Sequence, residues 1–503
     1  MFKSTLILAG LFCSLALVGA VACSTTGKNQ RRLSSVEIPK DLALGVSEFR
    51  ALVASEKLNR DTCAPLLDQI YQELLNQSST YFDREIITSR ARGLVEDGFL
   101  ARIELTKKLG WMLAEGPVEE ACVDGIRNML RAIRFAEENV AEFALQPASS
   151  PRAFAGGFPS LMVNPAHKDF EFRSGDVLLS RGNAVTSAAI ARIGDKDGQF
   201  SHLAIIYIDE VTKQRSVVEA HIEVGVEISS YEKYQDDGKL RAAIFRQPDA
   251  ALAHQAAKMI YERVKKQSST GRNVPYDFAM NLNDQRELFC SEVPYLGYKL
   301  ASQGTFDIPL FQTGVRMKND RFLKNLGVTA ERTFAPSDIE VDPRFELVAE
   351  WRNFEKTSRA RMLDSVLTQM FQWMEDYGYV LSNSPGQVLK KNFAWTLRRF
   401  GFFEEKFPLN MKRSAVGTIM ALDTVGGVLL EGLVNADRQF QAANGISMSA
   451  RDMREFLDGF RAADYERHKN WIAYNSKAAQ DGSDAILTPP EYPKFHMQFR
   501  PKR

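Results

Sequence analysis

Near the middle of the chain lies a short apolar run bounded by turn-forming residues, His202-Leu203-Ala204-Ile205-Ile206-Tyr207-Ile208. Runs of this length that are rich in branched side chains are typical of buried strands. Similar runs occur on both sides of it, at 175–179, 216–220 and 240–245. Helices are predicted over 184–193 and 250–266. Strands mixed with helices in this way indicate an α/β or α+β core.

Helical patterns precede this strand-rich segment. Residues 46–146 are predicted to form an N-terminal helical domain, in which Cys122, Ile126 and Met129 share one apolar face. Proline and glycine are concentrated over 147–159, so we expect a linker over 147–165.

A C-terminal helical domain is predicted over 352–503. Its expected helices cover 353–377, 384–400, 413–436 and 449–474. The apolar stretch 416–434 contains Asp423 and Glu431, so a buried helix or helix pair explains it better than a membrane span.

The apolar content is high enough for a large hydrophobic core, and the net charge of the chain is close to zero. With 503 residues, of which 45% are apolar and 25% charged, the chain is long enough for several domains. Its 64 basic and 63 acidic side chains nearly balance, and no long basic run occurs. Nucleic-acid binding is therefore not expected.

The first 22 residues have the features of an export signal, because Lys3 precedes the apolar stretch 6–22. The sequence Ala20-Val21-Ala22-Cys23 resembles a bacterial lipobox, in which the cysteine receives a lipid before the signal is removed. Ala20 stands where leucine is more usual, so cleavage at a plain small-residue site remains an alternative. An uncleaved membrane anchor is disfavoured because the run is short. We expect a protein of the bacterial cell envelope, facing the periplasm or the exterior, anchored through Cys23 and a tether over 23–45.

Export permits disulfides, and this changes the interpretation of the five cysteines. Cys13 leaves with the signal, and Cys23 would carry the lipid. Cys63 and Cys122 remain in the N-terminal helical domain, where a disulfide between them and two buried unpaired thiols are both reasonable. Cys290 is then without a partner and requires a chemical explanation.

Cys290 is the candidate nucleophile. The segment after it, 291–301, is predicted to be a helix with Pro294 in its first turn. A thiol at a helix N-terminus has a lowered pKa and a larger thiolate fraction. His202, at the start of an apolar strand, is the candidate base. These residues point to a cysteine hydrolase.

A third polar group must orient the histidine. Alternation along the strand predicted over 216–220 and just beyond it puts Glu219 and His221 on one face. We favour Glu219, because a carboxylate accepts the imidazole N–H and stabilises the imidazolium. His221 is the alternative. The other histidines lack the spacing of metal ligands, so neither a metal site nor a cofactor is expected.

Several short motifs occur in an order that matches one family. They are Phe172-Arg173-Ser174-Gly175-Asp176-Val177-Leu178-Leu179, Phe200-Ser201-His202-Leu203-Ala204-Ile205, Val218-Glu219-Ala220, Pro275-Tyr276-Asp277-Phe278, Phe289-Cys290-Ser291-Glu292 and Ala335-Pro336-Ser337-Asp338-Ile339. Together they resemble the circularly permuted papain-like amidases of the YaeF/YiiX type, in the NlpC-like superfamily. The histidine precedes the cysteine, as in the permuted members and unlike ordinary papain-like enzymes. The resemblance covers about 170–351 and leaves both helical flanks unmatched.

The resemblance implies an α+β fold, with a small antiparallel sheet packed on helices in a catalytic domain over 166–351. It implies that Cys290 is the nucleophile, that His202 is the general base and then the acid, and that Glu219 takes the third polar position. Asp176 and Tyr276 lie in matched segments. Together with His221 they are candidates for lining the cleft or binding the oxyanion, although structural roles fit Asp176 and Tyr276 equally well.

The expected reaction is acyl transfer through a thioester. Relatives of the permuted type are associated with lipid-like acyl substrates or with peptide amides, so such amides and esters are the expected substrates. Both hydrolysis and transfer to another acceptor are compatible with the residues. The alternative is a non-catalytic envelope lipoprotein that uses its papain-like domain for recognition, which the large unmatched helical regions favour.

Overall fold

The structure of the chain is a computed structural model that describes residues 36–144, 160–168, 170–236, 239–315, 320–398, 410–481 and 489–502. Four predicted features lie outside the described residues: the signal 1–22, Cys23, most of the tether, and the linker residues 147–159.

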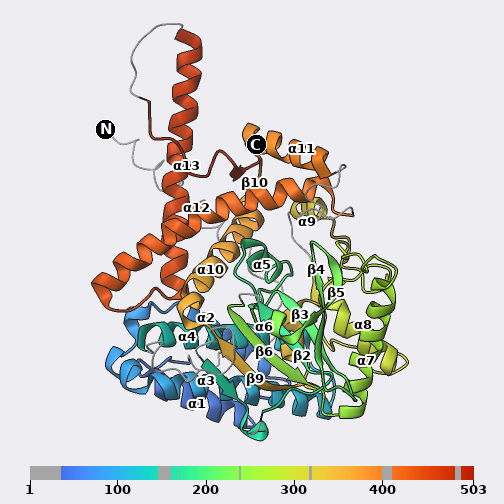
Figure 1. Cartoon of the computed structure of the whole chain (residues 1–503). Helices are drawn as coiled ribbons and strands as arrows, with labels where there is room; N and C mark the ends of the chain where they lie inside the picture. The colour runs from blue at the N-terminus through green and yellow to red at the C-terminus, as the bar shows by residue number, and fades with distance from the viewer. Residues whose placement is uncertain are drawn as a thin grey trace, which may run out of the picture. The chain divides into compact units, whose positions relative to one another are not determined.

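An antiparallel sheet lies at the centre of the fold (Figure 1). In the described part of the chain it has seven strands, in the order β1-β9-β6-β2-β3-β4-β5. They are β1 (Ser160–Val163), β2 (Val177–Arg181), β3 (His202–Ile208), β4 (Arg215–His221), β5 (Gly225–Ser230), β6 (Arg241–Arg246) and β9 (Glu346–Arg352). Every neighbouring pair is antiparallel. The core is therefore α+β, and the four strands expected from the apolar runs are confirmed as β2, β3, β4 and β6.

Both faces of the sheet are buried, which explains why its strands are continuous apolar runs rather than alternating patterns. The helices of this segment are α5 (Val185–Ile190), α6 (Tyr231–Asp236), α7 (Ala250–Ser268), α8 (Glu292–Ala301) and α9 (Asp320–Leu326). Leu179 and Leu203 share a core cluster with residues of α7 and α8 on one face. Their neighbours Leu178 and Ala204 cluster with Tyr231 of α6 on the other.

The predicted linker is wrong at its C-terminal end. Ser160–Val163 forms the edge strand β1, which pairs with β9 through Ser160↔Arg352 and the three pairs that follow. A strand of four residues is too short to carry a hydrophobic period of its own, and its partner lies far along the chain. The sheet therefore begins before residue 166 and ends at Arg352.

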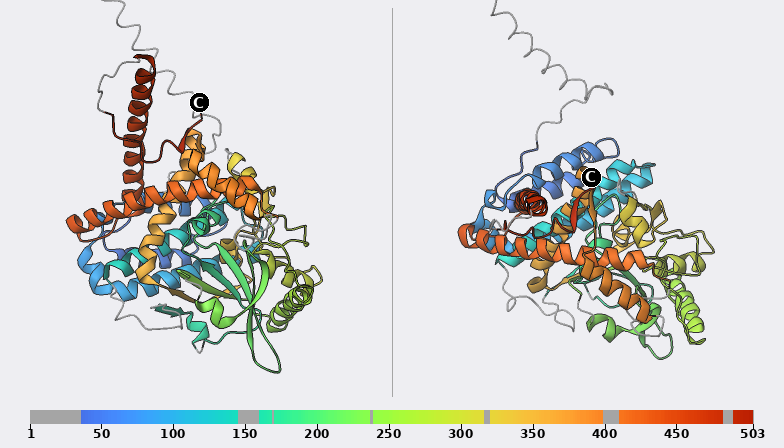
Figure 2. Two further views of the ribbon diagram at one scale, coloured as in Figure 1. Left: turned by 45° about the horizontal axis from the view of Figure 1, so that its top comes forward. Right: turned by 90° about the horizontal axis from the view of Figure 1, so that it is seen from above.

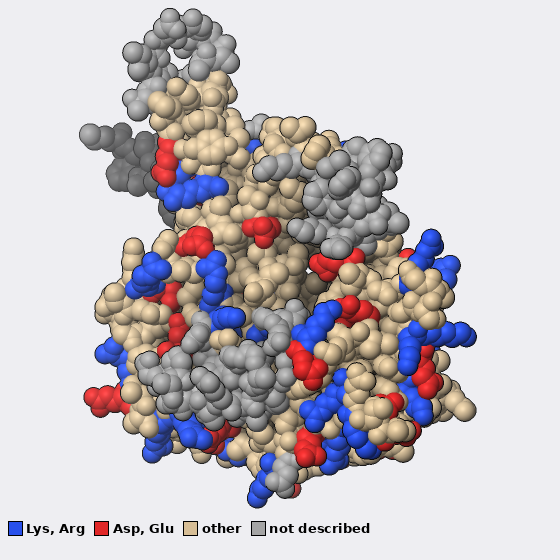
Figure 3. All heavy atoms as spheres, in the orientation of Figure 1, with Lys and Arg blue, Asp and Glu red and all other residues tan. Residues whose placement is uncertain are grey.

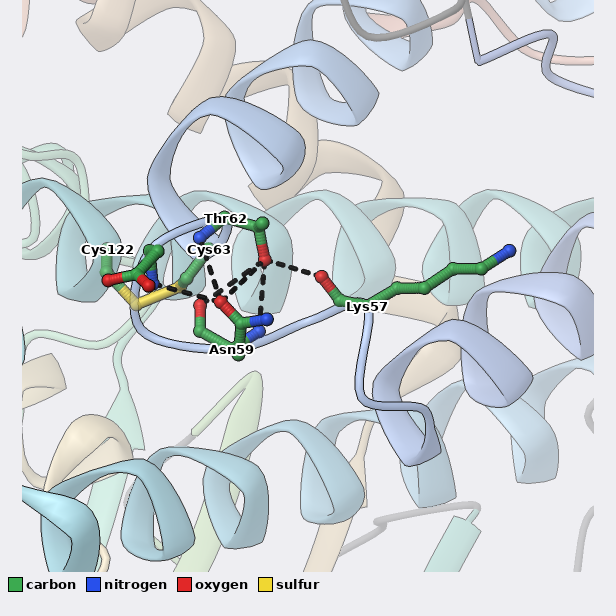
Figure 4. The surroundings of a disulfide bond; sticks show 6 residues. Lys57, Asn59, Thr62, Cys63 and Cys122 are labelled. Atoms are coloured by element: carbon green, nitrogen blue, oxygen red, sulfur yellow. Dashed lines mark hydrogen bonds between the residues drawn. A yellow bond between two sulfur atoms is a disulfide. The ribbon is translucent and has the colours of Figure 1, made fainter.

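In the described residues before the sheet lie the helices α1 (Leu42–Ala54), α2 (Cys63–Leu75), α3 (Arg84–Glu115) and α4 (Glu120–Ala144). Cys63 and Cys122 form a disulfide that joins the first residue of α2 to the start of α4 (Figure 4). The Asn59 side chain accepts the backbone N–H of Thr62 at 3.2 Å and so fixes the turn that leads into α2. The predicted disulfide is confirmed, and the alternative of two free thiols is excluded.

The described residues after the sheet form the helices α10 (Phe354–Tyr377), α11 (Pro385–Arg398), α12 (Arg413–Asn444) and α13 (Ala450–Asp481) (Figure 2). Among the described residues, α12 is long and apolar enough to cross a membrane by composition, but 56% of its most apolar window is buried. Val425, Leu429 and Leu433 belong to the main core cluster. A single buried helix therefore explains the apolar stretch 416–434, as expected.

Short elements complete the described part of the chain. They are the 3₁₀ turns η1 (Ser79–Tyr81), η3 (Pro165–His167) and η4 (Pro336–Val341), and the paired strands β7 (Thr313–Gly314) with β8 (Arg332–Thr333) and β10 (Tyr379–Leu381) with β11 (Phe499–Pro501). The β10–β11 pair fastens the C-terminal end to the residues that follow α10.

Buried ion pairs join the three segments that were predicted as separate domains. Arg102 of α3 contacts Glu350 of β9 at 2.7 Å, and Arg241 of β6 contacts Asp364 of α10 at 2.9 Å. Ile38–Arg503 accordingly forms one compact unit. Exposed charges of both signs intermix on the face drawn in Figure 3.

Candidate active site

Cys290 directly precedes helix α8, as expected from the sequence. Ser291 is the N-cap residue, and Glu292 donates its backbone N–H to the Phe289 carbonyl at 3.0 Å. The thiol is almost buried, with 3% of the residue exposed, and its Sγ lies 3.9 Å from the carbonyl oxygen of Ser201. Cys290 therefore lies just before the N-terminal, positive end of the α8 peptide dipoles, a position that favours the thiolate.

His202 connects Cys290 to Glu219. It is the first residue of β3, and its Nε2 lies 3.0 Å from Glu219 Oε2 on β4. The imidazole is also in hydrogen-bond contact with the Cys290 thiol. Because Nε2 is occupied by Glu219, Nδ1 is the ring nitrogen left for the sulfur. The structure thus brings together the three residues that were predicted to form the site.

The electrostatics of this trio favour a thiolate and an imidazolium. Burial lowers the pKa of His202, but the hydrogen bonds and negative charges of Cys290 and Glu219 outweigh burial and raise it to about 9. Burial raises the pKa of the Cys290 thiol, but the hydrogen bond and charge of His202, with the Leu203 N–H, outweigh it and lower that pKa. Both shifts favour the thiolate–imidazolium form of the pair.

Glu219 is held by Ser229 on the neighbouring strand β5 and by His221 on its own strand β4. Ser229 of β5 donates its hydroxyl to Glu219 Oε1 at 2.5 Å, and His221 Nε2 lies 3.3 Å from Oε2. Burial raises the pKa of the Glu219 carboxyl, but the two histidines outweigh burial and hold it well below its usual value. Glu219 is therefore a buried, ionised carboxylate that contacts both imidazoles.

The β4–β5 hairpin is tied to the segment that leads to Cys290. Gly225 has a φ of +77°, and a Cβ placed there would lie 2.1 Å from the Val274 carbonyl oxygen. Val226 donates its N–H to the same oxygen at 2.8 Å. This close approach requires glycine, and it fixes the backbone just before Tyr276.

Tyr276 shares a core cluster with Cys290 and is within electrostatic range of it, whereas Asp176 is bound to Arg246. Burial and the charge of Cys290 raise the pKa of Tyr276 well above its usual value, so its hydroxyl is neutral. Asp176 is fully buried and contacts Arg246 through both carboxylate oxygens at 2.7 Å.

Asp176 also precedes β2, while His202 pairs with Ser180 near the other end of that strand. Four residues of strand separate these positions by roughly 13 Å. The cleft-lining role considered for Asp176 is therefore wrong, because this carboxylate neutralises a buried arginine.

Two features of the site were missed in the sequence. Glu292 is buried and accepts the Phe289 N–H at 2.9 Å, and burial raises its pKa to about 9, so it is a neutral acid near the sulfur. An acidic residue in a first helical turn is common, so the pattern alone did not single it out. The second feature is a set of ligand-type atoms on His202, Glu219 and His221 that lie within 4.8 Å of one another. From the sequence, Glu219 and His221 were alternative partners of His202, because strand alternation alone does not show that both side chains lie beside its imidazole.

The fold and the site together are those of an α+β protein in which a cysteine just before a helix contacts a histidine, and the histidine contacts a glutamate on the neighbouring strand. No model of a known protein family matches the chain, and no curated protein matches its sequence.

Proposed function

We propose that the chain is a thiol hydrolase or acyltransferase that cleaves an amide or ester bond, with a core of the permuted papain-like type. The observation that carries this proposal is the position of His202, which contacts the Cys290 thiol and lies 3.0 Å from Glu219. Acyl transfer through a covalent intermediate uses a nucleophile, a base that activates it and a group that orients the base. The chain order, histidine before cysteine, and the antiparallel sheet support the permuted type.

The reaction follows from the protonation state of the site. The Cys290 thiolate attacks the carbonyl carbon and forms a C–S bond, and the His202 imidazolium gives its proton to the leaving amine or alcohol. The neutral imidazole then takes a proton from water or another acceptor, which attacks the thioester and releases the thiolate. The Cys290 backbone N–H, at the start of α8, is positioned to stabilise the oxyanion.

The proposed substrates are lipid-like acyl amides and esters or peptide amides. Cys290 is almost buried, but the side chains of His202 and His221 are 18% and 29% exposed. Substrate therefore approaches from the side of the two imidazoles.

A substrate screen tests this proposal. Purified chain is incubated with lipid amides, acyl esters and muropeptides, and intact mass spectrometry follows the protein. The expected result is product release together with a mass increase equal to the acyl group, mapped to Cys290. Cys290→Ala is the blank. Product that forms equally with this variant would contradict a thiol mechanism.

We also propose that the chain is an envelope lipoprotein. The Cys63–Cys122 disulfide supports export, because disulfides persist in oxidising compartments. Expressed in a bacterium, the wild-type chain is expected to incorporate labelled fatty acid and to sediment with membranes, whereas Cys23→Ala is expected to lose the label. Equal labelling of the two proteins would exclude Cys23 as the lipidation site.

The second candidate is a non-catalytic recognition module. One observation favours it, the 3% exposure of Cys290, which leaves little of the thiol open to a substrate. The reactivity of the thiol separates the two candidates, because a recognition module has no need of an activated sulfur.

A further inference from the structure

Two imidazoles approach one carboxylate oxygen beside the thiol. Glu219 Oε2 lies 3.0 Å from His202 Nε2 and 3.3 Å from His221 Nε2. The proposed acyl-transfer chemistry uses the first contact, since Glu219 orients His202. It does not require the second contact, so the position of His221 is left without a role in the reaction.

The strands place these three groups rigidly. His221 and Glu219 are two residues apart on β4 and so share one face of the sheet. The β3–β4 register, in which Ala204 faces Glu219, puts His221 opposite His202 when it is continued by two residues. The two imidazole rings are stacked, with centroids 5.3 Å apart and planes at 20°. A ligand set built on paired strands needs little reorganisation to bind.

We infer that His202, Glu219 and His221 form a binding site for a divalent ion of the zinc type, and that the bound ion switches off the Cys290 site. The second half of this inference rests on the proposed function. Two imidazole nitrogens and one carboxylate oxygen are a ligand set that zinc uses in proteins with an open fourth position. Magnesium and calcium prefer oxygen ligands and are excluded by the two nitrogens.

The geometry suits such an ion. Zinc–nitrogen and zinc–oxygen bonds of about 2.1 Å place tetrahedral ligand atoms roughly 3.4 Å apart. The two contacts to Glu219 Oε2 measure 3.0 and 3.3 Å, and all three ligand atoms lie within 4.8 Å of one another. Ser229 holds the other carboxylate oxygen at 2.5 Å, as an outer-shell hydrogen bond to a metal ligand does.

Metal binding and acyl transfer exclude each other at His202. A metal on Nε2 displaces the proton that this nitrogen donates to Glu219, and that proton is released to solvent. The one proton left on the ring then resides on Nδ1, the nitrogen that faces the sulfur. The Nδ1–H of such a neutral, metal-bound ring is a far weaker acid than the Nδ1–H of an imidazolium, so His202 can no longer protonate the leaving amine or alcohol, and while it keeps this proton it cannot accept one from the attacking water. The ion therefore blocks turnover without touching Cys290.

Metal affinity is measured first, without any substrate. The full chain is freed of metal with a chelator and then titrated with zinc against a chromophoric chelator. We expect one equivalent to bind, and we expect His221→Gln to weaken binding by about tenfold or more, because outer-shell changes alone cost that much. Glutamine keeps a hydrogen-bond donor for Glu219 but lacks the ring nitrogen, and circular dichroism checks that the variant is folded.

Two further variants serve as controls. His254 lies 3.1 Å from Glu210 and belongs to no three-residue ligand cluster among the described residues, so His254→Ala is expected to bind zinc as the wild type does. Cys290→Ala is expected to keep its zinc affinity, because the thiol is not a ligand. No binding by the wild type, or equal affinity of wild type and His221→Gln, would overturn the metal site. Loss of binding in Cys290→Ala would overturn the ligand set.

The switch is tested separately, with whichever acyl substrate the screen identifies. We expect the ratio of turnover without zinc to turnover with zinc to fall toward one in His221→Gln, and a chelator to restore wild-type turnover. Zinc that binds without affecting turnover would overturn the switch and leave the metal site standing. A chain that binds zinc at this site but acylates no substrate would instead count against the proposed function.

Discussion

At about pH 6.5, Cys290 of the metal-free protein is expected to react with iodoacetamide about 100-fold faster than Cys290 of the His202→Ala variant. In the wild type the imidazolium of His202 holds the sulfur as a thiolate, because it lowers the pKa of Cys290. In the variant that charge and hydrogen bond are gone, and burial keeps the pKa of the thiol at or above its ordinary value of about 8.5. Only about 1% of the thiol is then ionised at this pH.

The labelling rates of the wild type and of His202→Ala are expected to depend on pH in different ways. In the wild type, the rate is expected to stay nearly level from below neutrality to about pH 9, where His202 loses its proton. In the variant, the rate is expected to rise about tenfold per pH unit until the free thiol has ionised. The two rates therefore approach each other at alkaline pH and differ most under acidic conditions.

Mass spectrometry of the labelled peptide identifies the sulfur that reacts. Cys63 and Cys122 are protected in their disulfide, so Cys290 is the free cysteine of the described residues. His254→Ala is the matched control, because it removes a histidine that pairs with Glu210 on another part of the surface. Equally slow labelling of wild type and His202→Ala would reject the activated thiol and favour the recognition module.

Much of the sheet follows from local sequence patterns, and the parts that do not are those set by distant pairing. The apolar runs predicted β2, β3, β4 and β6, since each is long enough to carry a signal. Strand β1 was assigned to a linker, because its four residues become a strand only through pairing with β9. Whether the core is α/β or α+β also depends on strand direction, which no local run encodes.

The two reactive residues of the site were predictable, because a cysteine nucleophile and a histidine base can be recognised from residue type and local sequence. An odd cysteine before a helix and a histidine at a strand start are visible in the sequence, and the structure brings Cys290 and His202 into contact. The role of Asp176 was not visible, because its partner Arg246 lies on another strand and only the fold brings the two together. Strand alternation placed Glu219 and His221 on one face, but the approach of both residues to His202 depends on the β3–β4 pairing.

The same limit applies to the domain boundaries. Breaker residues and changes of pattern mark where helices give way to strands, but they carry no information on buried charge. Asp364 of α10 contacts Arg181 at 2.9 Å, Arg192 at 3.0 Å and Arg241 at 2.9 Å, and all four side chains are buried. Arg241 in turn pairs with Glu138 of α4. One carboxylate thus connects the C-terminal helices to the sheet, and through it to the N-terminal helices.

Replacing Asp364 by Ala is therefore expected to lower the free energy of unfolding by about 3–5 kcal/mol, the cost of leaving buried charges without their partner. Burial raises the pKa of Asp364, but the three arginines outweigh burial and hold it well below its usual value, so the group that is lost is a full negative charge. Denaturant unfolding followed by circular dichroism measures the change. Asp364→Asn keeps the shape of the side chain and separates the loss of charge from the loss of packing.

The control for this prediction is Asp376→Ala, on the same helix, because Asp376 is exposed and its loss is expected to leave unfolding unchanged. If Asp364 joins the three segments, Asp364→Ala moves a single cooperative transition that helix and sheet signals report alike. Two transitions, with only one of them shifted, would mean that the helical flanks unfold independently of the sheet. The buried arginines would then serve each segment by itself, and the interpretation of the chain as one cooperative unit would be wrong.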